Sequence, residues 1–139
     1  MTIVEACAKY WDTFKGDCSG FAKAVAHEVG VPLDGDANAI ADLLAAGAAG
    51  WEVLSDGAAA AEAAADRLVI GGLRGDRQAH PSAHGHVVIV VPGGLNRNKY
   101  PTAWWGNLHG TPYKDTTINY AWTAQDRDKV VYAAHAVAT

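Results

Sequence analysis

A cysteine at the start of a predicted helix is the first candidate for chemistry in this sequence. Cys18 lies in the segment Asp17-Cys18-Ser19-Gly20, and apolar residues at a spacing of three to four follow it as far as Val29. This spacing predicts a helix with one apolar face to which Cys18 belongs. In the first turn of a helix, unpaired backbone N–H groups and the helix dipole favour a thiolate and could stabilise an oxyanion. The pattern therefore predicts a nucleophilic thiol.

Cys18 also has a plainer interpretation. A free cysteine is most often a small buried hydrophobic residue, and taken alone Cys18 favours that interpretation. Gly20 changes the balance, because a glycine inside a helix costs roughly 1 kcal/mol relative to alanine, and a close approach by another segment or by a ligand would explain its presence. Cys7 lies in the middle of the preceding predicted helix without such a neighbour, and we expect it to be a core residue.

A base for this thiol must be held within about 3 Å of the sulfur, which requires a rigid element. His86 opens the run from His86 to Val91, whose β-branched residues predict a central strand covered on both faces. His27 lies roughly 13 Å from Cys18 along the helix axis and is expected at the surface. The other histidines lie in polar, unplaced or solvated segments: His80, His84, His109 and His135. His86 is therefore the predicted base, although at a strand end without a thiol it would be a structural residue.

A metal site is a second interpretation of the same residues. His84 and His86 would lie on one strand face, and His80 or Cys18 could join them as zinc ligands. The spacing departs from established zinc patterns, so a His-ligated metal hydrolase is kept only as an alternative, and we expect no metal and no cofactor.

The predicted elements place helices before strands. Helices are expected over residues 2–12, 17–30, 38–49, 58–65 and 126–138, and strands over 68–70, 86–91, 102–107 and 117–123, with a polar loop at 74–85. This order predicts an α+β fold with a mainly antiparallel sheet. No repeat or linker divides the chain, so residues 1–139 are expected to form a single catalytic domain.

Composition excludes several classes of protein. Half of the 139 residues are hydrophobic, which is enough for a core without disulfides or metal. The formal net charge is -4 and no basic face emerges, which argues against binding to nucleic acid or to an anionic membrane. No apolar run is long enough to insert into a bilayer, and the first residues lack the pattern of a secretory signal peptide.

Two motifs together resemble a known group of enzymes. The segment Asp17-Cys18-Ser19-Gly20-Phe21 before a helix, and Gly85-His86-Val87 opening a strand, resemble the NlpC/P60 group of papain-like cysteine peptidases. Over most of its length the chain is more narrowly similar to the first family of type VI secretion amidase effectors. The segments that carry this similarity are 11–12, 17–21, 30–32, 38–39, 68–70, 72–73, 85–87, 99–101, 104 and 126–128.

The resemblance implies a fold, an activity and partners. The fold would be of the papain-like NlpC/P60 type, with N-terminal helices packed on the sheet, and Cys18 and His86 would match the nucleophile and the base. The protein would be an antibacterial toxin delivered by the type VI secretion apparatus, without a signal peptide, into the periplasm of a target bacterium. There it would cut the γ-D-glutamyl–meso-diaminopimelate bond of peptidoglycan stem peptides, and an immunity protein would block its cleft.

The sequence departs from the family pattern at two places. In the family a cysteine follows the tryptophan of the later strand, whereas here Trp105 follows Trp104. The group that orients His86 is therefore open, and Asn107 or the backbone carbonyl near Trp105 are the candidates. A C-terminal cysteine that could bridge to the first helix is also missing, so Cys7 is expected to be a free thiol.

Residues beside the thiol are candidates for substrate binding. Asp17 and Ser19 flank Cys18 and could bind polar groups of the stem peptide, although Asp17 could instead cap the helix. Trp104 is a candidate for the wall of the cleft or, equally, a core residue. The alternative from another functional class is a non-catalytic module that binds the cell wall or a protein.

Overall fold

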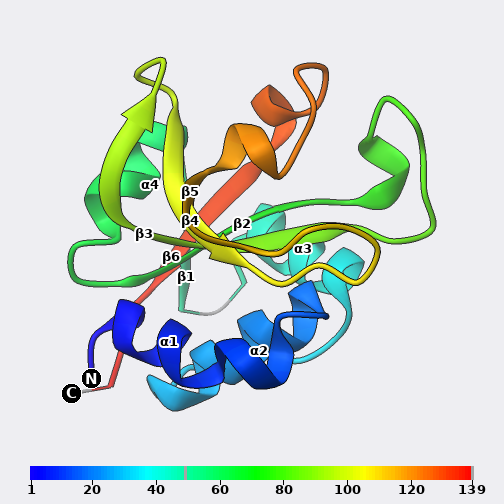
Figure 1. Cartoon of the computed structure of the whole chain (residues 1–139). Coiled ribbons are helices and arrows are strands. Elements are labelled where there is room, and N and C mark those ends of the chain that lie inside the picture. The colour runs from blue at the N-terminus through cyan, green and yellow to red at the C-terminus, as the bar shows by residue number, and fades with distance from the viewer. Residues whose placement is uncertain (49, 139) are drawn as a thin grey trace.

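In the part of the chain that the structure describes, four helices and a six-stranded sheet make up the fold (Figure 1). The computed structural model describes residues 1–48 and 50–138. The helices are α1 (Ile3–Phe14), α2 (Cys18–Glu28), α3 (Ala37–Ala46) and α4 (Gly57–Ala63). The strands are β1 (Trp51–Leu54), β2 (Leu68–Leu73), β3 (His86–Asn96), β4 (Tyr100–Trp105), β5 (Tyr113–Thr117) and β6 (Val131–His135). Short 3₁₀ turns occupy Gly75–Arg77, Ile118–Tyr120 and Arg127–Lys129. The predicted α+β class is confirmed.

The sheet is antiparallel in each of its pairings, with the strand order β1-β6-β2-β3-β4-β5. In the pairing of β2 with β3, Leu73 lies opposite His86. The end of β2 and the start of β3 therefore meet at the same edge of the sheet, and the loop of residues 74–85 projects from that edge.

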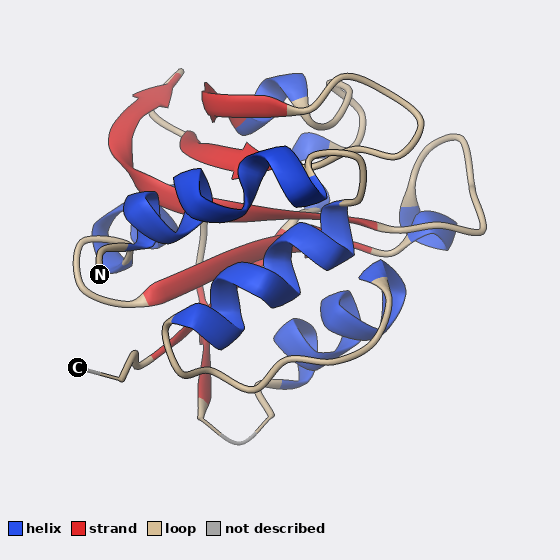
Figure 2. Cartoon of the chain, turned by 60° about the horizontal axis from the view of Figure 1, so that its bottom comes forward, coloured by secondary structure: helices blue, strands red, loops and turns tan. Residues whose placement is uncertain are grey.

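Two buried clusters lie on the two faces of the sheet. Helices α1, α2 and α3 cover one face, and α4 lies on the other (Figures 1 and 2). Along β3, Val87, Ile89 and Val91 belong to the cluster under the first three helices, whereas Val88 and Val90 belong to the cluster on the opposite face. The prediction of a central strand covered on both faces is thus confirmed.

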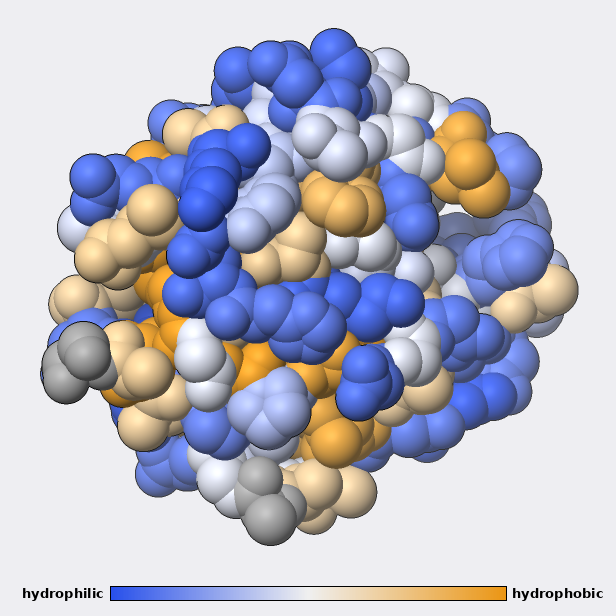
Figure 3. All heavy atoms as spheres, turned by 90° about the horizontal axis from the view of Figure 1, so that it is seen from below, coloured by the Kyte–Doolittle hydropathy of each residue, from blue (hydrophilic) through white to orange (hydrophobic). Residues whose placement is uncertain are grey.

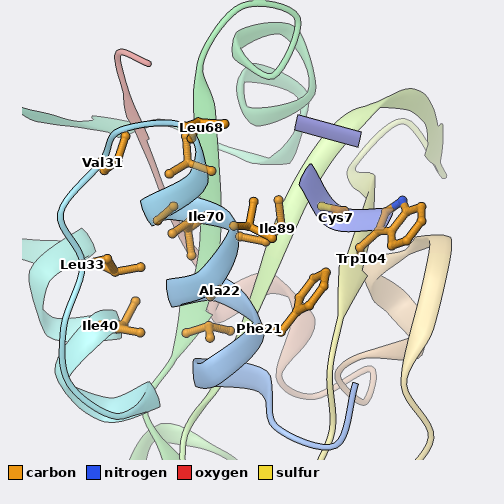
Figure 4. Packing of buried hydrophobic residues seen from close by; sticks show 14 of the residues in the cluster. Cys7, Phe21, Ala22, Val31, Leu33, Ile40, Leu68, Ile70, Ile89 and Trp104 are labelled. Carbon is orange, nitrogen blue, oxygen red and sulfur yellow. The ribbon is translucent and has the colours of Figure 1, made fainter. Parts of the chain in front are cut away.

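Helix α2 is held firmly on the sheet. Phe21 and Ala22 lie in the same cluster as Ile70 and Ile89 of the sheet (Figure 4), and both helix residues are 1% exposed. The helix ends before Gly30, whose φ of 79° is in the left-handed region that favours glycine. This packing fixes the position of the first residue of α2, which is Cys18.

The predicted C-terminal helix is wrong. Residues 131–135 form β6, which pairs with both β1 and β2. Ala133 faces the cluster under the helices, whereas Tyr132 and Ala134 face the other cluster. The alanine content of the segment favours a helix, but pairing on both edges and burial on both faces outweigh that local preference.

Other boundaries also differ from the prediction. A strand was expected at 117–123, but the observed strand β5 lies earlier and ends at Thr117. A 3₁₀ turn follows it at Ile118–Tyr120. Strand β1 was not predicted. Helix α3 ends at Ala46 because Gly47 adopts the left-handed conformation, and the predicted boundary at Ala49 lies outside the described residues.

The outer face of the helical layer is mixed in character. Figure 3 shows hydrophilic side chains across this face, with apolar side chains visible between them. Within residues 1–48 and 50–138, no helix combines the length and the apolar character that crossing a membrane requires.

Candidate active site

Cys18 is the first residue of α2, directly after Asp17, whose backbone is extended. The backbone N–H groups of Val87, Ser19 and Cys18 itself lie near the sulfur and lower the pKa of the thiol. Burial, the larger effect, and the nearby Asp17 carboxylate raise it, so the thiol pKa lies above its ordinary value. The thiol is therefore protonated at neutral pH and has backbone N–H donors around it.

His86 is the first residue of β3 and is half-buried. Its Nε2 atom is buried and has no hydrogen-bond partner, so Nδ1 is the nitrogen available to a neighbour in the pocket. Burial lowers the pKa of His86 to about 4 because an enclosed imidazole loses hydration of its charged form. The imidazole is therefore neutral at neutral pH and can accept a proton.

The structure brings Cys18 and His86 together at one pocket of about 120 Å³. The Val87 N–H that approaches the sulfur belongs to the residue that follows His86. The pocket lining comes from the starts of α2, α3 and β3 and from two loops: Asp17, Cys18, Ser19, Asp36, Ala37, Asn38, His84, Gly85, His86, Asn107, Leu108 and His109. A larger hollow of about 350 Å³ lies elsewhere, beside Asp56 and Tyr100, and its lining contains neither cysteine nor histidine.

The side chains predicted to flank the thiol are in the pocket. Asp17 occupies the N-cap position of α2, but its carboxylate makes no capping hydrogen bond. Instead the Ser19 hydroxyl donates to Asp17 Oδ1 at 3.1 Å. A Cβ atom on Gly20 would lie 2.6 Å from the other carboxylate oxygen of Asp17, the N-cap residue of the same helix, and 3.2 Å from the Phe14 ring, so neighbours along the chain limit the space at Gly20.

The two tryptophans do not line the pocket. Trp104 is 5% exposed and lies in the core under the helices, where its ring packs edge-on against Trp11 at 5.6 Å. Its Nε1 donates to Asp115 at 2.9 Å, so Trp104 does not form the predicted cleft wall. Trp105 faces the opposite side of the sheet and packs against the His86 ring.

Asn107, a candidate for orienting His86, lies in the pocket but is engaged elsewhere. Its side-chain oxygen accepts the His109 N–H at 3.2 Å, and its backbone N–H donates to the Lys15 carbonyl at 2.9 Å. Among the hydrogen bonds of the described residues, none joins Asn107 to His86. The structure therefore gives Asn107 a role in fastening β4 to the loop between α1 and α2.

Asn38 is a pocket residue that the motifs around Cys18 and His86 do not reveal. Its side-chain amide donates to the Ala83 carbonyl, and its side-chain oxygen accepts the Gly75 N–H, each at 2.9 Å. Asn38 thus clamps both ends of the loop that leads into His86. Its position at the start of a predicted helix was the available signal, but the spacing of residues did not reveal the clamp.

A pair of histidines faces the pocket from two loops. The rings of His84 and His109 lie 6.1 Å apart, and both residues are exposed. His84 therefore faces His109 across the pocket mouth. Within the part of the chain that the structure describes, no group of three or more histidine, cysteine or acidic residues is placed so that it could hold a metal ion.

Gly106, the residue that follows β4, is expected to be sensitive to substitution. A Cβ atom there would lie 2.7 Å from the backbone oxygens of both Asp17 and Phe14, so Gly106→Ala must push β4 away from the start of α2. We expect a loss of about 1–3 kcal/mol in the free energy of unfolding by urea and at least about a tenfold fall in turnover. Gly16→Ala is the matched control, since no atom lies within 4 Å of its added Cβ. Equal effects of the two substitutions would contradict this account.

A thiol at a helix start, an imidazole and backbone N–H donors in one pocket are the parts that a cysteine hydrolase requires. No family model matches the chain. The chain is, however, 38% identical to the peptidoglycan amidase Tse1 of Pseudomonas aeruginosa, in an alignment that covers 99% of this chain and 91% of that protein. The chain therefore belongs to the family of this amidase.

Proposed function

We propose that this protein is a cysteine amidase that cuts the γ-D-glutamyl–meso-diaminopimelate bond of peptidoglycan stem peptides. The observation that carries the proposal is the meeting of Cys18 and His86 in one pocket, at the N-terminus of α2. The substrate class is supported by membership in the family of a peptidoglycan amidase.

The ionisation of the two residues favours general base catalysis over a preformed ion pair. Burial raises the pKa of the Cys18 thiol and lowers the pKa of His86 to about 4, so both groups are uncharged near pH 7. His86 takes the thiol proton as the sulfur attacks the γ-glutamyl carbonyl. Backbone N–H groups at the start of α2 stabilise the oxyanion that forms.

The second half of the reaction returns both groups to their starting state. The imidazolium of His86 gives its proton to the amine of diaminopimelate as the C–N bond breaks, which leaves a thioester on Cys18. His86 then removes a proton from water, the resulting hydroxide attacks the thioester, and the thiol is protonated again. The products are a free γ-carboxyl group and a free amine.

The polar side chains around the pocket fit a zwitterionic peptide. Asp17 and Asp36 lie on the helical side, and His84 and His109 lie on the loop side. A stem peptide cut at this bond carries the ammonium group of diaminopimelate and carboxylates near the scissile amide. The ammonium group of diaminopimelate is bound by Asp17, together with Ser19, and by Asp36. The imidazoles of His84 and His109 face the carboxylates of the stem peptide.

The biological setting follows from the same proposal. The helices packed on an antiparallel sheet are consistent with a papain-like NlpC/P60 fold, in which Cys18 and His86 take the roles of nucleophile and base. The protein acts as a toxin in the periplasm of a rival bacterium after delivery by the type VI secretion apparatus. An immunity protein protects the producer by covering the pocket, where Leu108 is 69% exposed.

Digestion of purified sacculi tests the activity and the bond. Mass spectrometry is expected to find stem fragments that end in D-glutamate and fragments that begin with diaminopimelate. Cys18→Ala should yield neither fragment, and a chelator should leave the wild-type reaction unchanged. Identical muropeptide profiles with and without wild-type protein would instead favour a binding module, and loss of activity with the chelator would favour a metal hydrolase.

A further inference from the structure

The inner side of the His86 ring lacks the polar partner that usually orients a catalytic imidazole. Nε2 is buried without a hydrogen bond, as are the Nε1 atoms of Trp105 and Trp122. A buried polar atom without a partner costs about 1–3 kcal/mol. Its presence beside a candidate nucleophile therefore calls for an explanation in terms of function.

Two indole rings occupy the place of that partner. The Trp122 ring lies 5.2 Å from the His86 ring at an interplanar angle of 69°, and the Trp105 ring lies 6.4 Å away at 89°. Both arrangements are edge-to-face and within the 4.5–7 Å range in which aromatic pairs attract. The imidazole is thus enclosed by rings from two different segments of the chain.

Both indoles are themselves fixed in place. Trp105 is 1% exposed, and its ring packs against Tyr113 at 5.3 Å. Trp122 is 6% exposed and follows the 3₁₀ turn anchored by the fully buried Ile118, to whose carbonyl the Trp122 N–H donates at 3.2 Å. The two rings can therefore hold His86 in one orientation.

We propose that Trp122, supported by Trp105, is a positioning residue that orients the His86 imidazole by aromatic packing in place of a hydrogen-bonded third catalytic residue. This inference rests on the proposed function of His86 as the base. It assigns a role to Trp122, which does not line the pocket that holds Cys18.

The aromatic enclosure suits the chemistry of the base. To accept the thiol proton at Nδ1, the neutral ring must carry its own proton on Nε2. The interplanar angles of 69° and 89° allow an N–H edge of the imidazole to lie against an indole face, a contact that is favourable, whereas a nitrogen lone pair in that position would be repelled. Burial among the rings disfavours the imidazolium, in line with the lowered pKa of His86, so the packing favours the required tautomer and orientation of the neutral base.

The test compares Trp122→Leu with Trp122→Phe and with a matched control elsewhere. Trp51 is the control, because it is 7% exposed and its ring packs edge-on against His135 at 5.1 Å and 66°. Trp51→Leu therefore removes a similar indole–imidazole contact on β1, an edge strand that β6 and β2 separate from β3. Turnover and KM are measured on a soluble γ-D-glutamyl–diaminopimelate peptide, and the tautomer and titration of His86 are followed by NMR of histidine-labelled protein.

We expect Trp122→Leu to lower kcat by about 10- to 100-fold with little change in KM, and to let His86 titrate closer to its ordinary pKa of 6.5 than to the value of about 4. Trp122→Phe should restore most of kcat, and Trp51→Leu should lower stability without changing kcat or the His86 signals. The proposal is overturned if His86 keeps its tautomer and titration in Trp122→Leu, or if Trp51→Leu lowers kcat equally.

If Trp122→Leu does not fold, Trp122→Phe provides the test. A His86 titration in Trp122→Phe that matches the wild type supports the packing role, because phenylalanine also supplies a ring. A His86 titration that shifts when phenylalanine replaces the indole overturns it. The NMR measurements need no substrate, so a protein that leaves the peptide uncut overturns the proposed function while the NMR result still judges Trp122.

Discussion

Cys18→Ala is expected to lower the rate of stem-peptide hydrolysis by at least about 10⁴-fold, because no thioester can form without the sulfur. The loss should be in kcat, since the pocket loses only one sulfur atom and its other lining residues are retained. The rate is measured by release of the diaminopimelate amine from a soluble stem peptide. Sacculi incubated with the variant should keep their muropeptide profile.

The second cysteine provides an internal control. Cys7 is 0% exposed in the core under the helices, and burial raises the pKa of its thiol far above the ordinary range. Cys7→Ala should therefore retain turnover and lose only a modest part of the folding stability. Iodoacetamide should likewise alkylate Cys18, which is only half-buried, and spare Cys7 in the folded protein. A Cys18→Ala variant with full activity would disprove the assignment of the nucleophile. So would a Cys7→Ala variant that loses activity while Cys18→Ala retains it.

The proposed catalytic pair could be predicted because each residue marks a recognisable element. Cys18 opens a helix whose apolar spacing is regular, and His86 opens the strand with the densest run of β-branched residues. Rigid elements with strong periodicity are those that local sequence specifies best. Their meeting across the pocket followed from resemblance to a family, because no local rule states which helix packs on which strand.

The surroundings of His86 could not be predicted for the same reason. Trp122 follows a 3₁₀ turn at Ile118–Tyr120, in a segment whose alternating residues favour a strand. The fold places it beside His86 through the burial of Ile118, a long-range contact. Similarly, β6 has the composition of a helix, and only its place between β1 and β2 makes it a strand.

His86→Gln is the second change for which a large effect is expected. Glutamine keeps much of the volume of the ring but cannot accept the thiol proton, so kcat should fall by about 10²- to 10⁴-fold. In the wild-type protein, the acidic limb of the kcat/KM profile reports protonation of the base in the free enzyme. Because burial lowers the pKa of His86 to about 4, this limb should lie near that value and not near 6.5. An acidic limb near pH 6.5 would contradict the claim that burial lowers the pKa of His86. A His86→Gln variant with wild-type turnover would exclude His86 as the base.

The same enclosure makes stability depend on pH in a direction that can be worked out. The folded-state pKa of His86 is about 4 and its ordinary value is 6.5, so between these pH values the unfolded chain binds a proton that the folded chain does not. His86 therefore leaves stability unchanged above pH 6.5 and destabilises the fold as the pH falls towards 4, by about 3 kcal/mol in total. Urea unfolding of wild-type protein and His86→Gln at pH 7 and pH 4.5 measures this difference. Since glutamine does not titrate, the variant should lose less stability on acidification, and an equal loss in both proteins would show that His86 is already hydrated in the folded state.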